Sequence, residues 1–193
     1  RAIEASTKYF LTQAAASTLL LFSSMTNAWS TGQWDISQLT HPTSCLLLTT
    51  ALSMKLGLVP FHFWFPEILQ GSSLTTSLLL TTLMKFPPIT LLFLTSASLN
   101  PTLMSTMAIA SAALGGWMGL NQTQTRKILA FSSISHLGWM SIILIHNPKL
   151  TLITFYLYSL TTAAIFLTLN TTNTLKLSSM MTTWTKIPSL TST

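Results

Sequence analysis

The chain has 193 residues, of which 49% are hydrophobic and 6% are charged, and its mean hydropathy is +0.55. A soluble domain needs more surface charge than this to stay dispersed, so the composition excludes that class and predicts a membrane protein. The net charge of +6 comes from scattered basic residues, with Arg126 and Lys127 as the only adjacent pair, which argues against a phosphate-binding stripe and a nucleic-acid partner.

Apolar runs must contain roughly 17–25 residues to cross a bilayer as a helix. The second predicted helix has its own break between Gly57 and Pro60, and the pair Asn100–Pro101 marks the start of the fourth. The polar tail from residue 170 is predicted to be a loop that leads to more protein. The sequence therefore predicts one all-α transmembrane domain over 1–193, a bundle of about six helices at residues 8–25, 43–69, 74–98, 101–120, 126–145 and 150–169.

The first residues do not form a signal peptide, and we expect the chain to begin in the middle of a protein. If the six helices alternate in direction, the basic residues divide unequally between the two sides, and the side with more of them is the inner one. This bias places the N-terminus, the turn near Glu67 and the C-terminal tail on the inner side. The outer side receives Lys149, and the inner side receives Arg1, Lys8, Arg126, Lys127, Lys176 and Lys186.

Three titratable residues fall at one depth in this bundle. Lys55 lies about twelve residues into the second predicted helix, Lys85 about eleven into the third, and His136 about ten into the fifth, which places all of them near the bilayer midplane. A charged side chain at this depth opposes insertion by about 2.5–3.5 kcal/mol. We therefore expect a function for them, and their chemistry suits a proton relay.

Prolines follow each lysine closely. Pro60 removes a helical partner from the carbonyl of Leu56, and Pro87 and Pro88 do the same for the carbonyls of Leu83 and Met84. In a membrane, such carbonyls must be buried in protein or face water. The alternative for each lysine is a structural contact to a carbonyl or hydroxyl group, and for His136 a hydrogen-bonded packing role beside Ser132, Ser133 and Ser135.

The remaining polar and small residues have more ordinary interpretations. His62 fits an aromatic belt at the membrane interface or a proton entry point, and Glu67 and Asp35 fit solvated helix ends. Cys45 has no partner for a disulfide or a metal site. Gly115, Gly116 and Gly119 form a small-residue face that permits close helix packing.

Three motifs carry a resemblance to a known family: KLGLVPFHFWFPEILQG at 55–71, MKFPP at 84–88 and TRKILAFSSISHLGW at 125–139. Over essentially its whole length the chain closely resembles the antiporter-like membrane subunits of mitochondrial NADH:ubiquinone oxidoreductase, respiratory complex I. The resemblance implies an inverted-repeat helical fold with broken helices. It also implies that Lys55 is the lysine of the broken helix, that Lys85 is a bridging lysine, and that His136 continues the polar axis.

The same resemblance implies that a glutamate partner of Lys55 precedes Arg1 and that a further lysine follows Thr193. It implies a multi-pass location in the mitochondrial inner membrane, with both ends of this chain on the matrix side and other complex I subunits and lipid as partners. No cofactor is expected in this chain, since no redox or nucleotide motif occurs in it. NADH, FMN, iron–sulfur clusters and ubiquinone are expected in other subunits.

Three functions follow from these residues. The leading one is a proton-translocating subunit of the enzyme, in which Lys55, Lys85 and His136 pass protons while quinone reduction elsewhere supplies the energy. The alternatives are a stand-alone cation/proton antiporter that uses the same lysines, and a structural membrane spacer in which the lysines bind carbonyls or lipid.

Overall fold

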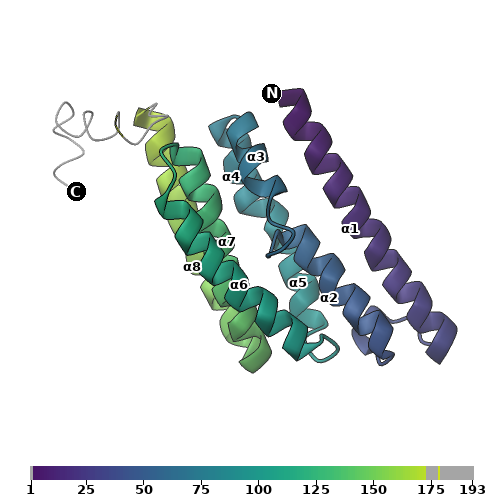
Figure 1. Ribbon diagram of the computed structural model, residues 1–193. Coiled ribbons are helices and arrows are strands. Elements are labelled where there is room, and N and C mark those ends of the chain that lie inside the picture. Colours follow the sequence, from purple (N-terminus) through teal and green to yellow (C-terminus); the bar gives the residue numbers. More distant parts are fainter. Residues whose placement is uncertain (1, 173–177, 179–193) are drawn as a thin grey trace.

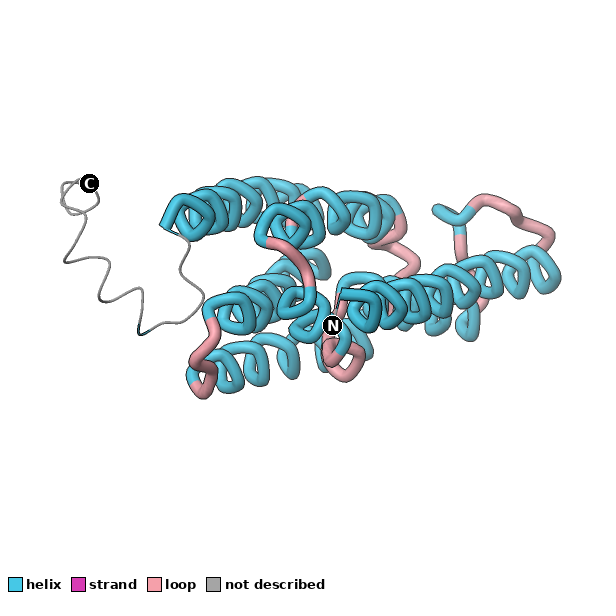
Figure 2. The backbone as a smooth tube through the Cα atoms, turned by 90° about the horizontal axis from the view of Figure 1, so that it is seen from above, coloured by secondary structure: helices cyan, strands magenta, loops and turns pink. Residues whose placement is uncertain are grey.

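The computed structural model describes residues 2–172 and residue 178, so the predicted C-terminal loop lies largely outside the described residues. Helices run alongside one another as an elongated bundle (Figures 1 and 2). The N-terminus, the α3–α4 turn and the last residues of α8 lie at the same end of it (Figure 1). In chain order the elements are α1 (Ala2–Thr31), η1 (Ile36–Gln38), α2 (Pro42–Leu56), α3 (Trp64–Gly71), α4 (Leu74–Thr81), η2 (Leu83–Lys85), α5 (Phe86–Leu94), α6 (Pro101–Leu120), α7 (Thr125–His146) and α8 (Pro148–Thr172).

The first helix is longer than the predicted range 8–25. It continues in both directions through polar residues, and it ends where Gly32 adopts a left-handed conformation with φ of 74°. The amide of Gly32 still donates to the carbonyl of Ala28 at 2.9 Å. A count of apolar residues predicts only the segment that is hydrophobic enough to lie in the bilayer. The helix is longer, because it continues until a residue that ends helices, Gly32.

The helix predicted over 43–69, with its break between Gly57 and Pro60, is two helices in the structure. α2 ends at Leu56. The next residue, Gly57, has a φ of 79° that is readily accessible to glycine, and its amide donates to the carbonyl of Ser53 at 2.9 Å. Residues 58–63 form turns, and α3 resumes at Trp64. The break therefore begins at the glycine, three residues before Pro60.

The helix predicted over 74–98, with a proline break beside Lys85, is interrupted in the structure and ends earlier than the predicted range. It divides into α4, η2 and α5, and α5 stops at Leu94. Pro87 lies in the first turn of α5, where a missing backbone donor costs nothing, so the prolines start a new helix. The carbonyl of Leu83, predicted to lose its helical partner, accepts a tighter bond from the amide of Phe86.

Helices α6 and α7 approach each other closely at two glycines. A methyl group on Gly115 would lie 2.7 Å from the amide nitrogen of Ser135, and one on Gly138 would lie 2.7 Å from the carbonyl oxygen of Ala108. Gly119 makes an ordinary contact with Phe131, and Gly116 has open space around it. Of the three glycines predicted as one packing face, Gly115 makes the closest approach.

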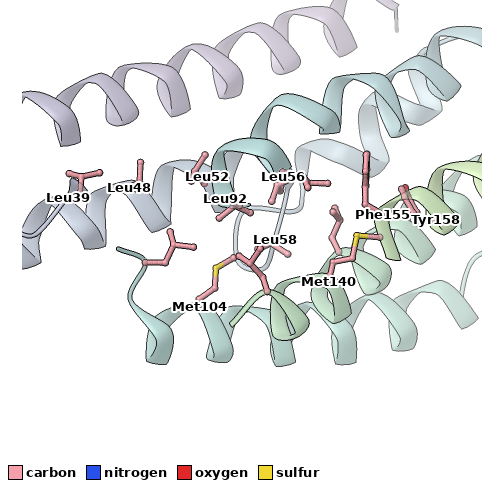
Figure 3. Packing of buried hydrophobic residues seen from close by; sticks show 14 residues of the cluster. Leu39, Leu48, Leu52, Leu56, Leu58, Leu92, Met104, Met140, Phe155 and Tyr158 are labelled. Atoms are coloured by element: carbon pink, nitrogen blue, oxygen red, sulfur yellow. The ribbon is translucent and has the colours of Figure 1, made fainter. Parts of the chain in front are cut away.

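A buried apolar cluster joins α2 and α5 to α6, α7 and α8 (Figure 3). It brings Leu52 and Leu56 of α2 together with Leu92 of α5, Met104 of α6 and Tyr158 of α8. Packing between α1 and α2, between α3 and α7, and between α4 and α8 completes the arrangement. The core therefore includes residues that flank both helix breaks, such as Leu56 and Leu58 at one break and Ile89 near the other.

Four stretches of the described chain are long and apolar enough to cross a membrane. They are Leu74–Leu94, Pro101–Leu120, Thr125–His146 and Pro148–Thr172. α2 and α3 are shorter than a membrane span, with 15 and 8 residues, and α1 is not among the four. The structure shows an all-helical chain with several candidate spans, and the count of six stays a prediction.

Arg126 joins the start of α7 to the turn between α3 and α4. Its Nη1 donates to the carbonyl of Ser72 at 2.6 Å. We expect Arg126→Met to speed amide hydrogen exchange at residues 72–74 about tenfold, because a charged hydrogen bond contributes about 1.5–3 kcal/mol. The neighbouring change Lys127→Met is the control, and equal exchange in both variants would show that the bond does not hold this turn.

Candidate functional site

Lys85 places a buried ammonium group at the interrupted helix. It is the last residue of η2 and is 3% exposed. Its Nζ donates to the hydroxyl of Tyr158 at 3.4 Å and lies 4.3 Å from the ring centroid of Phe65. A hydrogen bond and an aromatic face both stabilise a cation, so this site can hold a charged lysine.

Lys55 and Lys85 line the same small cavity. Lys55 lies in the last turn of α2, is half-buried, and its carbonyl accepts from Nε2 of Gln13 at 3.4 Å. The cavity has a volume of about 20 Å³, which is room for about one water molecule. The residues that line it are Tyr9, Gln13, Lys55, Trp64, Phe65, Leu80, Met84 and Lys85.

Tyr158 extends this constellation towards α7. Its hydroxyl donates to the carbonyl of Thr81 at 3.4 Å, and its ring centroid lies 5.6 Å from that of His136. Tyr158 is 3% exposed and was not predicted as a site residue. The signal that could have found it is its depth, because it lies ten residues after the start of α8, as Lys85 lies eleven after the start of α4.

His136 lies in the middle of α7, on the surface of the bundle. Its side chain belongs to the exposed class, with one side of the ring against Tyr158. The three serines near it do not serve it, since the hydroxyls of Ser132 and Ser133 donate to the carbonyl of Leu129, and that of Ser135 to Ser132. The structure thus brings Lys55, Lys85 and His136 to one region and leaves His136 on its outer side.

Lys8 forms two ion pairs with other described residues. Its Nζ lies 3.0 Å from Oε1 of Glu4 and 2.5 Å from Oε2 of Glu67, which ties α1 to α3 at the end of the bundle. Both partners are more than half exposed, so this network contributes little to stability. Within the described ranges, neither Lys55 nor Lys85 pairs with a carboxylate.

His62 is more buried than either of its predicted roles requires. It is 3% exposed in the α2–α3 break, and its ring stacks near that of Phe63 with centroids 4.2 Å apart. Neither ring nitrogen has a hydrogen-bond partner among the described residues. His62 also lines an open pocket of about 480 Å³ together with Glu67 and Lys127.

Asp35 is exposed and caps the start of η1. Its carboxylate accepts from the amide of Ser37 at 3.0 Å, and this bond holds the pKa of the carboxyl below its ordinary value. Among the described residues, no group of three or more His, Cys, Asp or Glu could hold a metal ion.

Comparison with known proteins gives a consistent family. A sequence model described as NADH:quinone oxidoreductase/Mrp antiporter matches residues 1–193. A protein named NADH-ubiquinone oxidoreductase chain 2 from Struthio camelus is 75% identical over 98% of this chain and 55% of its own length. One of the same name from Coturnix japonica is 70% identical over 100% of this chain and 56% of its own length. The chain spans about half the length of these curated relatives, and they confirm the resemblance drawn from the three motifs.

Solved structures show the same fold. A chain of respiratory complex I from Thermus thermophilus with bound aureothin matches with a TM-score of 0.73 and 27% identity, over 84% of this chain and 40% of that chain. A chain of the Mrp complex from Dietzia sp. DQ12-45-1b matches with a TM-score of 0.77 and 21% identity, over 86% of this chain and 34% of that one. The second likeness concerns the fold alone.

Proposed function

The chain belongs to the NADH:quinone oxidoreductase/Mrp antiporter family, and we propose that it forms part of a longer membrane subunit of NADH:ubiquinone oxidoreductase that translocates protons. The observation that carries the proposal is the cavity of about 20 Å³ that Lys55 and Lys85 both line. Two amines that share a water-sized space at a helix break can exchange a proton through one intervening water.

The proposed step moves one proton and leaves the total charge unchanged. A proton leaves the ammonium of Lys55 and arrives on the neutral amine of Lys85, so that Lys55 becomes neutral and Lys85 charged. Like charges on neighbouring groups disfavour one another, so two lysines that line one cavity are not charged together at low cost. Since Lys85 is fully enclosed and His136 is exposed, the proton continues past Tyr158 towards the surface at His136.

The proposal includes the finer architecture. α1, together with α2 and α3 joined as one broken helix, would complete six passes with the four candidate spans, as part of an inverted-repeat fold. The location is the mitochondrial inner membrane, with the N-terminus and the C-terminal tail on the matrix side. Support comes from Figure 1, where the start of α1 lies at the same end of the bundle as the α3–α4 turn. The pair between Lys8 of α1 and Glu67 of α3 joins the two helices there.

Partners and cofactors follow from the same proposal. Other membrane subunits of the complex and the lipid bilayer surround the chain, and a carboxylate partner for Lys55 is expected on a helix before Arg1. NADH, FMN, iron–sulfur clusters and ubiquinone would belong to other subunits, which supply the energy for the proton step. The names of the curated relatives favour this function over a stand-alone antiporter or a structural spacer.

The test is Lys55→Met in the assembled enzyme, with protons translocated per NADH oxidised as the measurement. We expect coupled transport to fall at least about tenfold, because positioned acid–base groups contribute about 10²–10⁴-fold to proton transfer. Lys149→Met is the matched control, since Lys149 is exposed at the start of α8. Unchanged pumping in the Lys55 variant would rule out the relay.

A further inference from the structure

Tyr158 contacts two of the three proposed relay residues, Lys85 and His136. Its hydroxyl accepts from Nζ of Lys85 at 3.4 Å and donates to the carbonyl of Thr81 at the same distance. Its ring packs against His136, with centroids 5.6 Å apart, and against Phe155, with centroids 6.3 Å apart. One buried phenol therefore contacts Lys85, which lines the cavity, the carbonyl of Thr81 at the interrupted helix, and the exposed His136.

The helix break is what makes the carbonyl of Thr81 available. In an uninterrupted helix this carbonyl would accept from the amide of Lys85. That amide instead donates to the carbonyl of Thr82 at 3.3 Å, because Leu83–Lys85 forms a 3-10 turn. Tyr158 replaces the missing donor, and a buried carbonyl without one would cost about 1–3 kcal/mol.

The arrangement fixes the direction of both hydrogen bonds while Lys85 is charged. A phenol has one proton to donate, and an ammonium group has no lone pair with which to accept. The proton of Tyr158 therefore goes to Thr81, and its oxygen accepts from Lys85. A neutral Lys85 amine has a lone pair, so the phenol can then turn its proton towards Nζ and leave the carbonyl of Thr81 without its donor.

We propose that Tyr158 is a positioning residue that holds the Lys85 ammonium at the shared cavity and couples the charge state of Lys85 to the α4–α5 break. The inference rests on the proposed function, because it concerns how that relay is held and switched. When Lys85 loses its proton, the hydrogen bond across the break is released. The break is then free to rearrange before the next proton arrives.

The groups that face Lys85 come from every element around it. They are Tyr9 of α1 and Lys55 of α2 at the cavity, Phe65 of α3, and Tyr158 of α8 with His136 of α7 behind it. Among the described residues none of these is a carboxylate. The hydroxyl of Tyr158 is the oxygen that accepts a hydrogen bond from the Lys85 ammonium.

The test compares Tyr158→Phe with Tyr156→Phe in the assembled enzyme. Tyr156 lies on the same helix and is 63% exposed, so its variant controls for the loss of a phenol. Phenylalanine keeps the ring against His136 and Phe155 and removes the oxygen that stabilises the charged lysine. We expect the pH above which protons pumped per NADH decline to move down by about one unit in the Tyr158 variant and to stay unchanged in the Tyr156 variant.

A second variant, Tyr158→Gln, separates the polar contact from packing. Its amide oxygen can accept from Lys85 and its NH₂ can donate to Thr81, so we expect a pH profile closer to that of the unmodified enzyme. The inference fails if assembled Tyr158→Phe keeps the unmodified profile, or if the glutamine variant shifts as far as the phenylalanine one. Normal pumping by Lys55→Met would instead remove the proposed function itself, whichever result Tyr158 gives.

Discussion

Replacing Lys85 with methionine is expected to stop proton transport without weakening the fold. The ammonium is 3% exposed, and the described residues provide it with no carboxylate. Enclosing such a charge is costly, and replacing buried charges with apolar groups of similar size is often neutral or stabilising by about 1–4 kcal/mol. We expect coupled transport to fall at least about tenfold, while the thermal midpoint of the assembled enzyme stays the same or rises.

This pair of measurements separates the relay from a structural spacer. If Lys85 served mainly to hold Tyr158 and the helix break together, Lys85→Met would lower the thermal midpoint and leave pumping unchanged. The relay requires the opposite pattern. Transport and stability therefore have to be measured on the same preparation.

Lys85→Arg is the control for charge alone. Arginine keeps a positive group at this position but does not lose its proton at any relevant pH. We expect it to slow transport as much as methionine does. If the arginine variant pumped normally, a fixed charge would be sufficient, and the exchange of a proton at Lys85 would be wrong.

Local signals in the sequence account for much of the fold. The predicted range 101–120 coincides with α6, because Asn100 accepts from the amide of Leu103 at 3.2 Å and Pro101 occupies the first turn. The end of α2 is similarly local, since Gly57 supplies a conformation that few other residues adopt readily. Both features depend on residues within one helical turn.

The division of α4 from α5 could not be read in the same way. Pro87 and Pro88 indicate an irregularity, but the sequence does not say whether a helix bends around prolines or ends and starts again. Packing decides this, because Tyr158 of α8 supplies a donor to the carbonyl of Thr81 that the break exposes. That contact joins residues 77 positions apart.

Depth counting placed the two lysines at one level, yet depth does not say which side of a helix a residue occupies. For this reason the sequence gives Lys55 and Lys85 the same predicted depth and cannot distinguish their burial. In the structure Lys85 is enclosed, whereas Lys55 is half-buried. Tyr158 was missed because a tyrosine in an apolar span is uncharged at neutral pH and carries no insertion penalty like that of lysine.

Gly138→Ala is expected to destabilise the packing of α7 on α6 by about 1–3 kcal/mol. The added methyl would lie 2.7 Å from the carbonyl oxygen of Ala108, the amide nitrogen of Ala112 and Oγ of Ser111. Two of these atoms are backbone, so the helices must separate to relieve the clash. His136 lies two residues from Gly138 on α7, and we therefore expect reduced pumping as well as a lower thermal midpoint.

Gly116→Ala is the matched control, because it adds the same methyl to α6 at a position with nothing within 4 Å. There the higher helix propensity of alanine would leave stability unchanged or raise it by up to about 1 kcal/mol. Equal thermal midpoints for the two variants would contradict the close approach at Gly138. A loss confined to Gly138→Ala would instead show that the close approach of α6 and α7 at Gly138 stabilises the fold, since the two variants differ only in where the methyl group lies.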